Sequence, residues 1–276
     1  MDGGCAVSHI ATHRQGFAAG YTAVTRAADA VNFTGIGFGV LRLAAGETWR
    51  GCIERETAWL LMSGAARVKA GDLEAALART SLFDESASCL HAAAGTLVEL
   101  HASVATELTV YDCLNMRGFA PRIFRPADVP NEPRGKGQVR DRSLRYVRTI
   151  FDAGNSPPEA GLVLGEVVTF PGGWSSYPPH HHPQPEIYHY RFTAPQGYGH
   201  AELGEAVVKV REFDTVCIPA GHDHAQCAAP GYGMYYSWVI RHLPGAPYTA
   251  PSFTPEHAWT MSRDARFWWP AEGGHD

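Results

Sequence analysis

The sequence has few charges and lacks long hydrophobic runs. Charged residues make up 18% of its 276 residues, and a formal net charge of −5 provides no basic stripe for a nucleic-acid backbone. No stretch reaches the roughly 18 uninterrupted apolar residues that cross a bilayer, and the opening MDGGCAVSHI lacks the basic-then-apolar plan of a secretory signal. We therefore expect a cytoplasmic protein without a nucleic-acid or membrane partner.

Closely spaced cysteines are lacking too. A chain of this length buries a core without crosslinks, and no CxxC pair is present to hold a metal or form a redox motif. We predict reduced and mostly buried thiols at all six cysteines, which are Cys5, Cys52, Cys89, Cys113, Cys217 and Cys227.

Glycine and proline, by contrast, are frequent, with 29 and 19 residues. The segment VLRLAAGETWRGCIERETAWLLMSGAARVKAGD (40–72) places alternating or wholly apolar runs between glycines. Short runs of this kind, bounded by turn residues, are typical of β-strands. The composition therefore predicts an all-β protein.

The order of these features repeats in the second half of the chain. Glu56 in ERETAW stands where Glu186 stands in QPEIYHYRF, and VKAGD (68–72) matches VKVREFD (208–214). A duplicated β-sandwich barrel explains this order. We predict an N-terminal barrel over residues 1–120, a linker rich in proline, glycine and charge over 121–145, and a C-terminal barrel over 146–276.

The segment PPHHHPQPE carries the strongest chemical signal. His180 and His182 lie two apart, so in a strand both project from one face, and a proline-bracketed turn brings Glu186 alongside. His224 follows a further turn in IPAGHDHAQ. Three imidazoles and one carboxylate form a ligand set for a divalent metal, with Zn²⁺ expected first and Mn²⁺, Fe²⁺ or Ni²⁺ as alternatives. The competing interpretation is a solvated polyhistidine turn, and His181, of opposite parity, is expected to face away.

The first half carries no equivalent ligand set. GCIERETAW contains no histidine pair, and only His91 lies in the stretch around LHAAAG. We expect Glu56 to be structural and the first barrel to bind no metal.

The spacing HxHxxxE followed by PxGxxH matches the two conserved stretches of the cupin superfamily. Within it, the chain resembles the bacterial bicupin family of 5-deoxy-glucuronate isomerases and pectin-pathway uronate isomerases. The resemblance runs from about Gly37 to Trp259. It rests on VLRLAAGETW (40–49), LLMSGAARV (60–68), PRGKG (133–137), GGWSSYPPHHH (172–182), EIYHYRF (186–192), PQGYG (195–199), APGYGMYY (229–236) and PEHAW (255–259).

This resemblance implies a bicupin whose second barrel holds the metal at His180, His182, Glu186 and His224. It also implies conversion of the sugar acid 5-deoxy-D-glucuronate to 2-deoxy-5-keto-D-gluconate in myo-inositol catabolism, by a protein that forms homo-oligomers. The chain departs from the family in a shorter loop before Glu186, a shorter hairpin (HAELGEA) after PQGYG, and YYSWVIRH (235–242) in place of the usual YYLNVMAG. These departures alter expected pocket walls and leave the ligand set whole.

Candidate acid–base groups lie beside the expected ligands. Tyr188 and Tyr190 share the parity of Glu186, so they are expected to face the same cavity and to relay protons or bind substrate hydroxyls. Aromatic packing in the barrel core is the alternative. His222 and Asp223 precede His224 and could act as a base or orient that ligand, although a hydrated turn explains them equally well.

A sugar acid also needs a partner for its carboxylate. Arg191 or Lys136 could supply that cation, although the parity of Arg191 opposes this role and surface salt bridges would explain both. His257 and Trp259 in PEHAW could close the cavity, with packing as the simpler role of Trp259.

Two other functions fit the same ligand set. An Fe²⁺-dependent cupin dioxygenase would use three histidines and one glutamate with open positions for oxygen. A sugar-binding cupin without catalysis is suggested only by the shortened loops.

Overall fold

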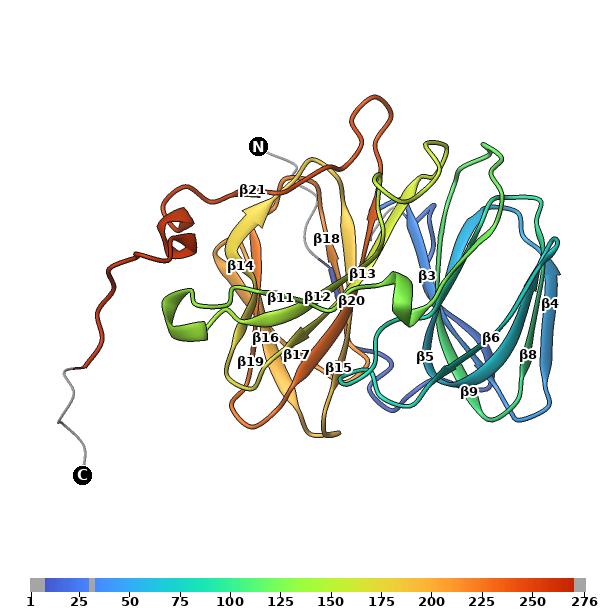
Figure 1. The fold of residues 1–276 in the computed structure, drawn as a ribbon, viewed down its shortest axis with the longest axis horizontal. Helices are drawn as coiled ribbons and strands as arrows, with labels where there is room; N and C mark the ends of the chain where they lie inside the picture. Colours follow the sequence, from blue (N-terminus) through green and yellow to red (C-terminus); the bar gives the residue numbers. More distant parts are fainter. Residues whose placement is uncertain (1–7, 30–32, 271–276) are drawn as a thin grey trace.

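A computed structural model describes residues 8–29 and 33–270, and almost every regular element in it is a β-strand (Figure 1). In these residues the helices are three short 3₁₀ turns: η1 (Pro126–Asp128), η2 (Val139–Asp141) and η3 (Ala258–Met261). No helix in the described ranges is both long and apolar enough to span a membrane. The all-β prediction is confirmed.

The first barrel occupies the right of Figure 1 and is built on one long strand, β5. The first half of β5 pairs with β7 and β9, and its second half pairs with β6 and β8. Gly64 lies between these halves with φ of +96°, and a Cβ there would lie 2.4 Å from the carbonyl oxygen of Ala105, so only glycine fits the bend. The strands are β2 (Gly20–Thr25), β3 (Ile36–Leu43), β4 (Thr48–Cys52), β5 (Glu56–Ala70), β6 (Leu73–Arg79), β7 (Cys89–Ala92), β8 (Leu97–Ala102), β9 (Thr106–Cys113) and β10 (Arg122–Phe124).

The second barrel is a sandwich of two sheets, of seven and five strands in the described residues. The seven-stranded sheet has the order β1-β18-β15-β20-β13-β12-β11, and the five-stranded sheet has the order β17-β16-β19-β14-β21. Their strands are β1 (Ser8–Ile10), β11 (Glu132–Arg134), β12 (Arg145–Phe151), β13 (Leu162–Thr169), β14 (Trp174–His181), β15 (Glu186–Phe192), β16 (Tyr198–Leu203), β17 (Ala206–Arg211), β18 (Thr215–Ile218), β19 (His224–Ala228), β20 (Met234–Arg241) and β21 (Ser252–Phe253).

The segment between the barrels has more structure than its composition indicates. In 121–145 the strand β10 extends the first sheet beside β7, and β11 extends the second beside β12. β1, near the start of the chain, pairs with β18 of the second barrel. Composition does not reveal such three-residue edge strands, because edge pairing depends on which neighbour the fold brings alongside.

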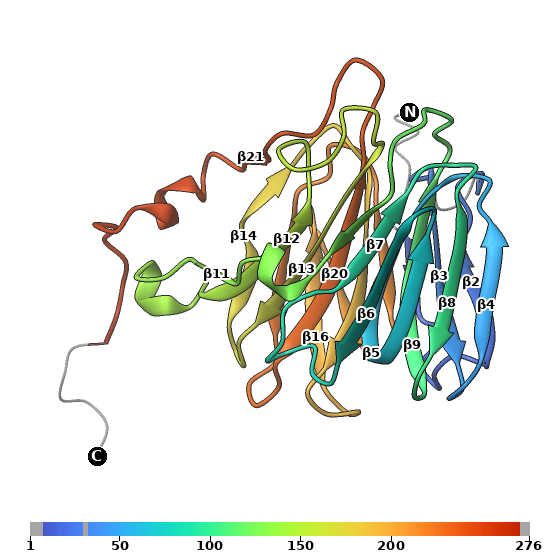
Figure 2. The same cartoon turned by 45° about the vertical axis from the view of Figure 1, so that its right-hand side comes forward.

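Three apolar cores follow from the alternation of side chains along the strands. One fills the first barrel, one fills the second, and a third lies between the nine-stranded and seven-stranded sheets. Figures 1 and 2 show these sheets following one another along the molecule. Four of the five cysteines in the described residues are buried or half-buried, and all five are free; Cys5 lies outside those residues.

Glu56 and Glu186 begin corresponding strands but face different cores. Glu56 shares its face of β5 with Ala58 and Leu60, which lie in the core between the barrels. Glu186 shares its face of β15 with Tyr188, which lies inside the second barrel. The sequence correspondence between the two glutamates therefore does not extend to their surroundings.

Glu56 joins the two halves of the chain by hydrogen bonds. Its carboxylate accepts from the backbone amides of Gly161 (2.7 Å) and Leu162 (2.9 Å) and from Asn115 Nδ2 (2.5 Å), and it contacts His91 Nε2 at 2.8 Å. Burial by itself would raise the pKa of Glu56, but His91 and the other donors outweigh it and hold the pKa below its ordinary value.

We predict that Glu56→Gln lowers the free energy of unfolding by about 2–4 kcal/mol, because an amide NH₂ would then face the other donors in a buried site. The pKa of Glu56 is lowered by folding, so its charge stabilises the fold above the unfolded-state pKa, and this contribution is lost as the pH falls through the lower folded-state pKa. Urea unfolding at several pH values should show the difference between variant and wild type shrinking in acid. Glu54→Gln, at an exposed neighbour, should stay within about 0.5 kcal/mol of wild type.

Candidate metal centre

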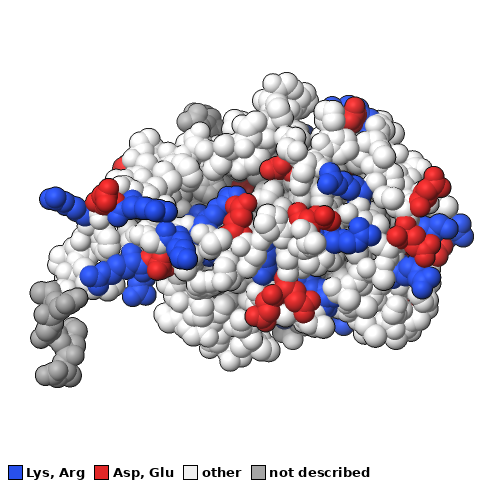
Figure 3. Space-filling model, in the orientation of Figure 1, with Lys and Arg blue, Asp and Glu red and all other residues white. Residues whose placement is uncertain are grey.

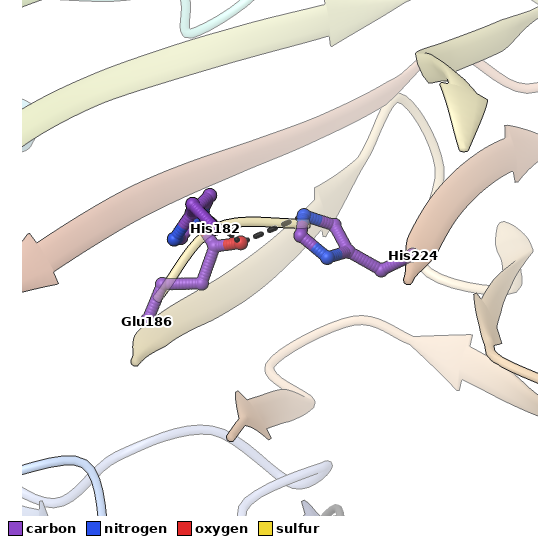
Figure 4. Close-up of side chains that lie close together, drawn as sticks. All are labelled: His182, Glu186 and His224. Carbon is purple, nitrogen blue, oxygen red and sulfur yellow. Dashed lines mark ion pairs between the residues drawn. The ribbon is translucent and has the colours of Figure 1, made fainter. Parts of the chain in front are cut away.

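Three side chains from different parts of the second barrel meet at one buried point (Figure 4). His182 directly follows β14, Glu186 begins β15 and His224 begins β19. Their potential ligand atoms all lie within 4.8 Å of one another, and all three residues are buried. The structure thus brings together three of the four residues singled out as metal ligands, at the spacing a single ion requires.

The contacts among these three groups leave one buried oxygen without an ordinary partner. Glu186 Oε1 lies 2.7 Å from His224 Nε2 and 3.2 Å from His182 Nε2. His224 Nδ1 lies 2.9 Å from the carbonyl oxygen of His222 and donates to it, so Nε2 is the nitrogen that faces Glu186. A lone pair facing a carboxylate oxygen is repulsive unless a proton or a cation lies between them. Neither Glu186 Oε1 nor His224 Nε2 has a hydrogen-bond partner in the described residues.

His180 stands next to this cluster. It pairs in register with His224 across β14 and β19, after an irregularity in β14 that follows Ser175, and the two rings lie 4.4 Å apart between centroids. Its Nδ1 lies 3.1 Å from the carbonyl oxygen of Ser176, so Nδ1 is the donor and Nε2 is the nitrogen left available to a ligand. Burial, with the nearby His224, lowers the pKa of His180 to about 3, which keeps its ring neutral at pH 7.

The electrostatics of the cluster fit a divalent cation. Burial would raise the pKa of Glu186, but the two neighbouring imidazoles hold it well below its ordinary value, so the carboxylate is ionised. Glu186 in turn outweighs burial and raises the pKa of His224. One anionic oxygen and imidazole nitrogens, all buried, make a donor set suited to Zn²⁺, Mn²⁺, Fe²⁺ or Ni²⁺. His181, between two of these histidines, instead contacts the partly exposed Asp223 at 2.7 Å and lies outside the cluster.

A cavity of about 340 Å³ opens onto this cluster. Its volume suits a small organic molecule. Its walls include the ligand candidates His180, His182 and Glu186, and they come from both sheets and from the chain after β20. The other lining residues are Arg134, Arg145, Val147, Thr149, Asp152, Val163, Val167, Ser176, Tyr188, Trp238, Ile240, Tyr248, Thr249, Ala250, Pro251 and Phe253.

Of the two tyrosines with the parity of Glu186, only Tyr188 lines this cavity. Its hydroxyl lies 3.2 Å from Ser176 Oγ, which is 2.9 Å from the hydroxyl of Tyr236. Burial and the charge of Glu186 raise the pKa of Tyr188 well above its ordinary value, so the hydroxyl stays protonated. Tyr190 points into the barrel core, where its hydroxyl donates to Gln226 Oε1 at 2.8 Å.

The other residues selected from the sequence lie outside the cavity wall. Arg191 is buried and pairs with Glu107 at 2.5 Å and Glu212 at 3.5 Å, so its charge is already neutralised. Lys136 is exposed, and the His222 side chain is only partly buried. His257 lines a separate cavity together with Trp259, which is 49% exposed. Arg191 does not line the cavity, because, as its parity in the sequence indicates, the strand directs this side chain to the other face of the sheet.

Sequence reasoning missed several polar residues of the cavity. Arg134 and Arg145 line it, as do Asp152 and Tyr248. Arg134 lies within the PRGKG motif, which was the only available signal. The other three come from the segment between the barrels and from loops, whose position no strand pattern predicts.

Comparison with known proteins places this geometry among related chains. The model of the KduI/IolB family matches residues 9–260. A 5-deoxy-glucuronate isomerase from Geobacillus kaustophilus is 28% identical over 254 residues, covering 84% of this chain and 88% of the relative. The protein of the same name from Lacticaseibacillus casei is 27% identical, covering 81% and 87%.

Solved structures show the same fold. An IolB-like protein from Salmonella typhimurium is 27% identical, with a TM-score of 0.72 over 82% of this chain and 90% of that one. An oxalate decarboxylase from Lactobacillus farciminis has a TM-score of 0.60 at 14% identity, covering 82% and 81%, and this likeness concerns the fold alone. The expected cupin architecture and the resemblance to the uronate isomerases are confirmed.

We predict that the purified protein retains about one divalent ion per chain, and that Glu186→Gln or His224→Ala lowers its metal affinity by at least about 100-fold, because each change removes a candidate ligand atom from the cluster. Elemental analysis measures the metal content. In wild-type protein stripped of metal by chelation, added Zn²⁺ or Mn²⁺ at about 100 times Kd should raise stability by about 2.7 kcal/mol.

The matched control for these variants is His181→Ala, which removes the neighbouring imidazole that faces away. It should keep both the metal content and the metal-dependent rise in melting temperature. Equal metal loss in all three variants would contradict this assignment of ligands.

Proposed function

The chain belongs to the KduI/IolB family, and on that premise we propose that it is a metal-dependent aldose–ketose isomerase of a sugar acid. The reaction we propose converts 5-deoxy-D-glucuronate to 2-deoxy-5-keto-D-gluconate in myo-inositol catabolism. Curated relatives that share most of its length are named 5-deoxy-glucuronate isomerase. The observation that carries the proposal is the buried cluster of His182, Glu186 and His224 at the wall of a cavity large enough for a sugar acid.

The reaction sets clear chemical demands. Moving a carbonyl between adjacent carbons requires removal of the proton next to it, through an enediolate whose developing negative charge must be stabilised. A divalent cation held by His180, His182, Glu186 and His224 would supply that stabilisation as a Lewis acid. The remaining requirements are to orient the sugar, to exclude water and to move the proton.

Residues of the cavity wall suit these tasks. The protonated hydroxyl of Tyr188 faces the cavity and connects through Ser176 to Tyr236, forming a short chain along which a proton can pass. We assign proton transfer at the phenolic oxygen to Tyr188. Buried apolar side chains, among them Val163 and Ile240, line part of the cavity and limit the access of water there.

We expect the metal-loaded protein to convert 5-deoxy-D-glucuronate to the ketose, as followed by NMR. Chelation should lower kcat by more than about 100-fold, and returning the metal should restore it. Oxygen consumption with Fe²⁺ in place of isomerisation would indicate a cupin dioxygenase. Binding of the sugar without turnover by the fully loaded protein would indicate a non-catalytic sugar-binding cupin.

The two tyrosines provide a separate test of the proton relay. Tyr188→Phe should lower kcat by about 10²–10⁴ with little change in KM, because it removes a proton donor without altering the cavity shape. Tyr190→Phe should lower stability by about 1 kcal/mol through loss of its bond to Gln226, and should leave kcat within a few-fold. The assignment fails if the two variants lose activity equally while remaining equally folded.

A further inference from the structure

One cation on the cavity wall lacks a counter-charge. Arg145, at the start of β12, donates from Nη1 to the carbonyl oxygen of Ser143 (2.9 Å) and from Nη2 to that of Tyr177 (3.2 Å). Its Nε is buried and has no hydrogen-bond partner, and no ion pair involves this side chain among residues 8–29 and 33–270. Burial lowers the pKa of Arg145, which reflects the cost of holding its charge away from water.

A second arginine lies directly opposite the first. In the pairing of β11 with β12, Arg134 stands in register with Arg145, and both residues line the cavity. Like charges facing each other across two strands destabilise the pair unless an anion lies between them. Gly135 follows with φ of +78°, and a Cβ there would lie 2.3 Å from the carbonyl oxygen of Ser143 and 2.9 Å from Arg145 Nη1. The turn of PRGKG is therefore shaped around Arg145.

The acids near the cavity do not neutralise Arg145. Glu186 is engaged by its two histidines, and Asp152 accepts from the amide of Gly154 at 2.8 Å. Within the described ranges Arg134 forms one ion pair, with the partly exposed Glu132 at 3.0 Å. Figure 3 shows Lys and Arg side chains gathered over the left of the molecule, where Figure 1 draws β11 and the turn after it.

We propose that Arg145, assisted by Arg134, binds the carboxylate of the sugar acid and so determines which substrates enter the site. The inference rests on the proposed function for the identity of the sugar. A planar guanidinium with free N–H groups matches a carboxylate in a bidentate arrangement. Binding the acid group at this wall leaves the rest of the sugar to extend toward Glu186 and Tyr188, which line the same cavity.

The test separates recognition from turnover by measuring binding directly. Calorimetry on the metal-loaded protein compares D-glucuronate, neutral D-glucose and D-glucose 6-phosphate. We expect the wild type to bind the carboxylate at least about 10-fold more tightly than glucose, and Arg145→Met to abolish this preference. Tighter binding of the phosphate than of the carboxylate, or an undiminished preference in Arg145→Met, overturns the proposal.

Kinetics with 5-deoxy-D-glucuronate provide the second readout. Arg145→Met should raise KM by about 10- to 100-fold with a smaller change in kcat, and the exposed Arg134→Met by about 3- to 10-fold. Arg145→Lys keeps the positive charge but loses the planar, bidentate guanidinium. Its KM should lie between those of the wild type and Arg145→Met. Arg125→Met, at an exposed arginine outside the cavity, is the control and should match wild type.

Two further outcomes distinguish the proposals from each other. If Arg145→Met fails to fold by circular dichroism, the Arg134→Met and Arg145→Lys series decides, and unchanged binding in both overturns the inference. A wild type that prefers D-glucuronate through Arg145 but forms no ketose refutes the isomerase and leaves carboxylate recognition standing. Normal turnover with unchanged KM in folded Arg145 variants refutes carboxylate recognition by Arg145 and leaves the isomerase standing.

Discussion

The candidate site depends on an ionised carboxylate held inside the barrel by imidazole rings. Glu186 Oε1 lies 2.7 Å from His224 Nε2, and neither atom has a hydrogen-bond partner within the described part of the chain. Burying a charge in this way is unfavourable unless a cation or proton compensates it. The strand register maintains the arrangement, because His180 lies opposite His224 and β15 begins at Glu186 itself. The strand register that builds the barrel therefore also places the carboxylate of Glu186 beside the histidines.

The glutamates that begin corresponding strands of the two barrels have different surroundings. Glu186 faces the interior of the second barrel. Glu56 faces the core between the barrels and accepts hydrogen bonds from the backbone amides of Gly161 and Leu162. The interior of the first barrel is filled instead by apolar side chains, among them Trp59, Leu61 and Leu100. A shift of one position along a strand exchanges its two faces. That shift accounts for one barrel carrying a cluster of potential ligands while the other joins the two halves.

Buried arginines show the same division between structure and ligand binding. Arg79 and Arg148 both contact Glu166 between the barrels, at 2.6 and 2.8 Å, and Arg191 pairs with Glu107 across the same junction. Each of these cations has an acid from the protein itself. Arg145 has none, and it lines the cavity. A half-buried cation such as Arg145, without an acid among the described residues, is stabilised when an anion from outside binds it.

The sequence by itself determined the all-β class and the cupin resemblance, and it singled out His182, Glu186 and His224, which the fold brings together. That His182, and not His180, joins this cluster depends on the chain leaving β14 at His181. The sequence could not decide which of Tyr188 and Tyr190 lines the cavity. Both share the parity of Glu186, and they differ only in their position along the barrel. Nor could it exclude Arg191 or identify Arg145. Those roles depend on which acids lie nearby in space, and these come from β9 and from segments far apart in the chain. Local alternation is set by the backbone, whereas the pairing of charges is set by packing between distant strands, so only the tertiary structure decides it.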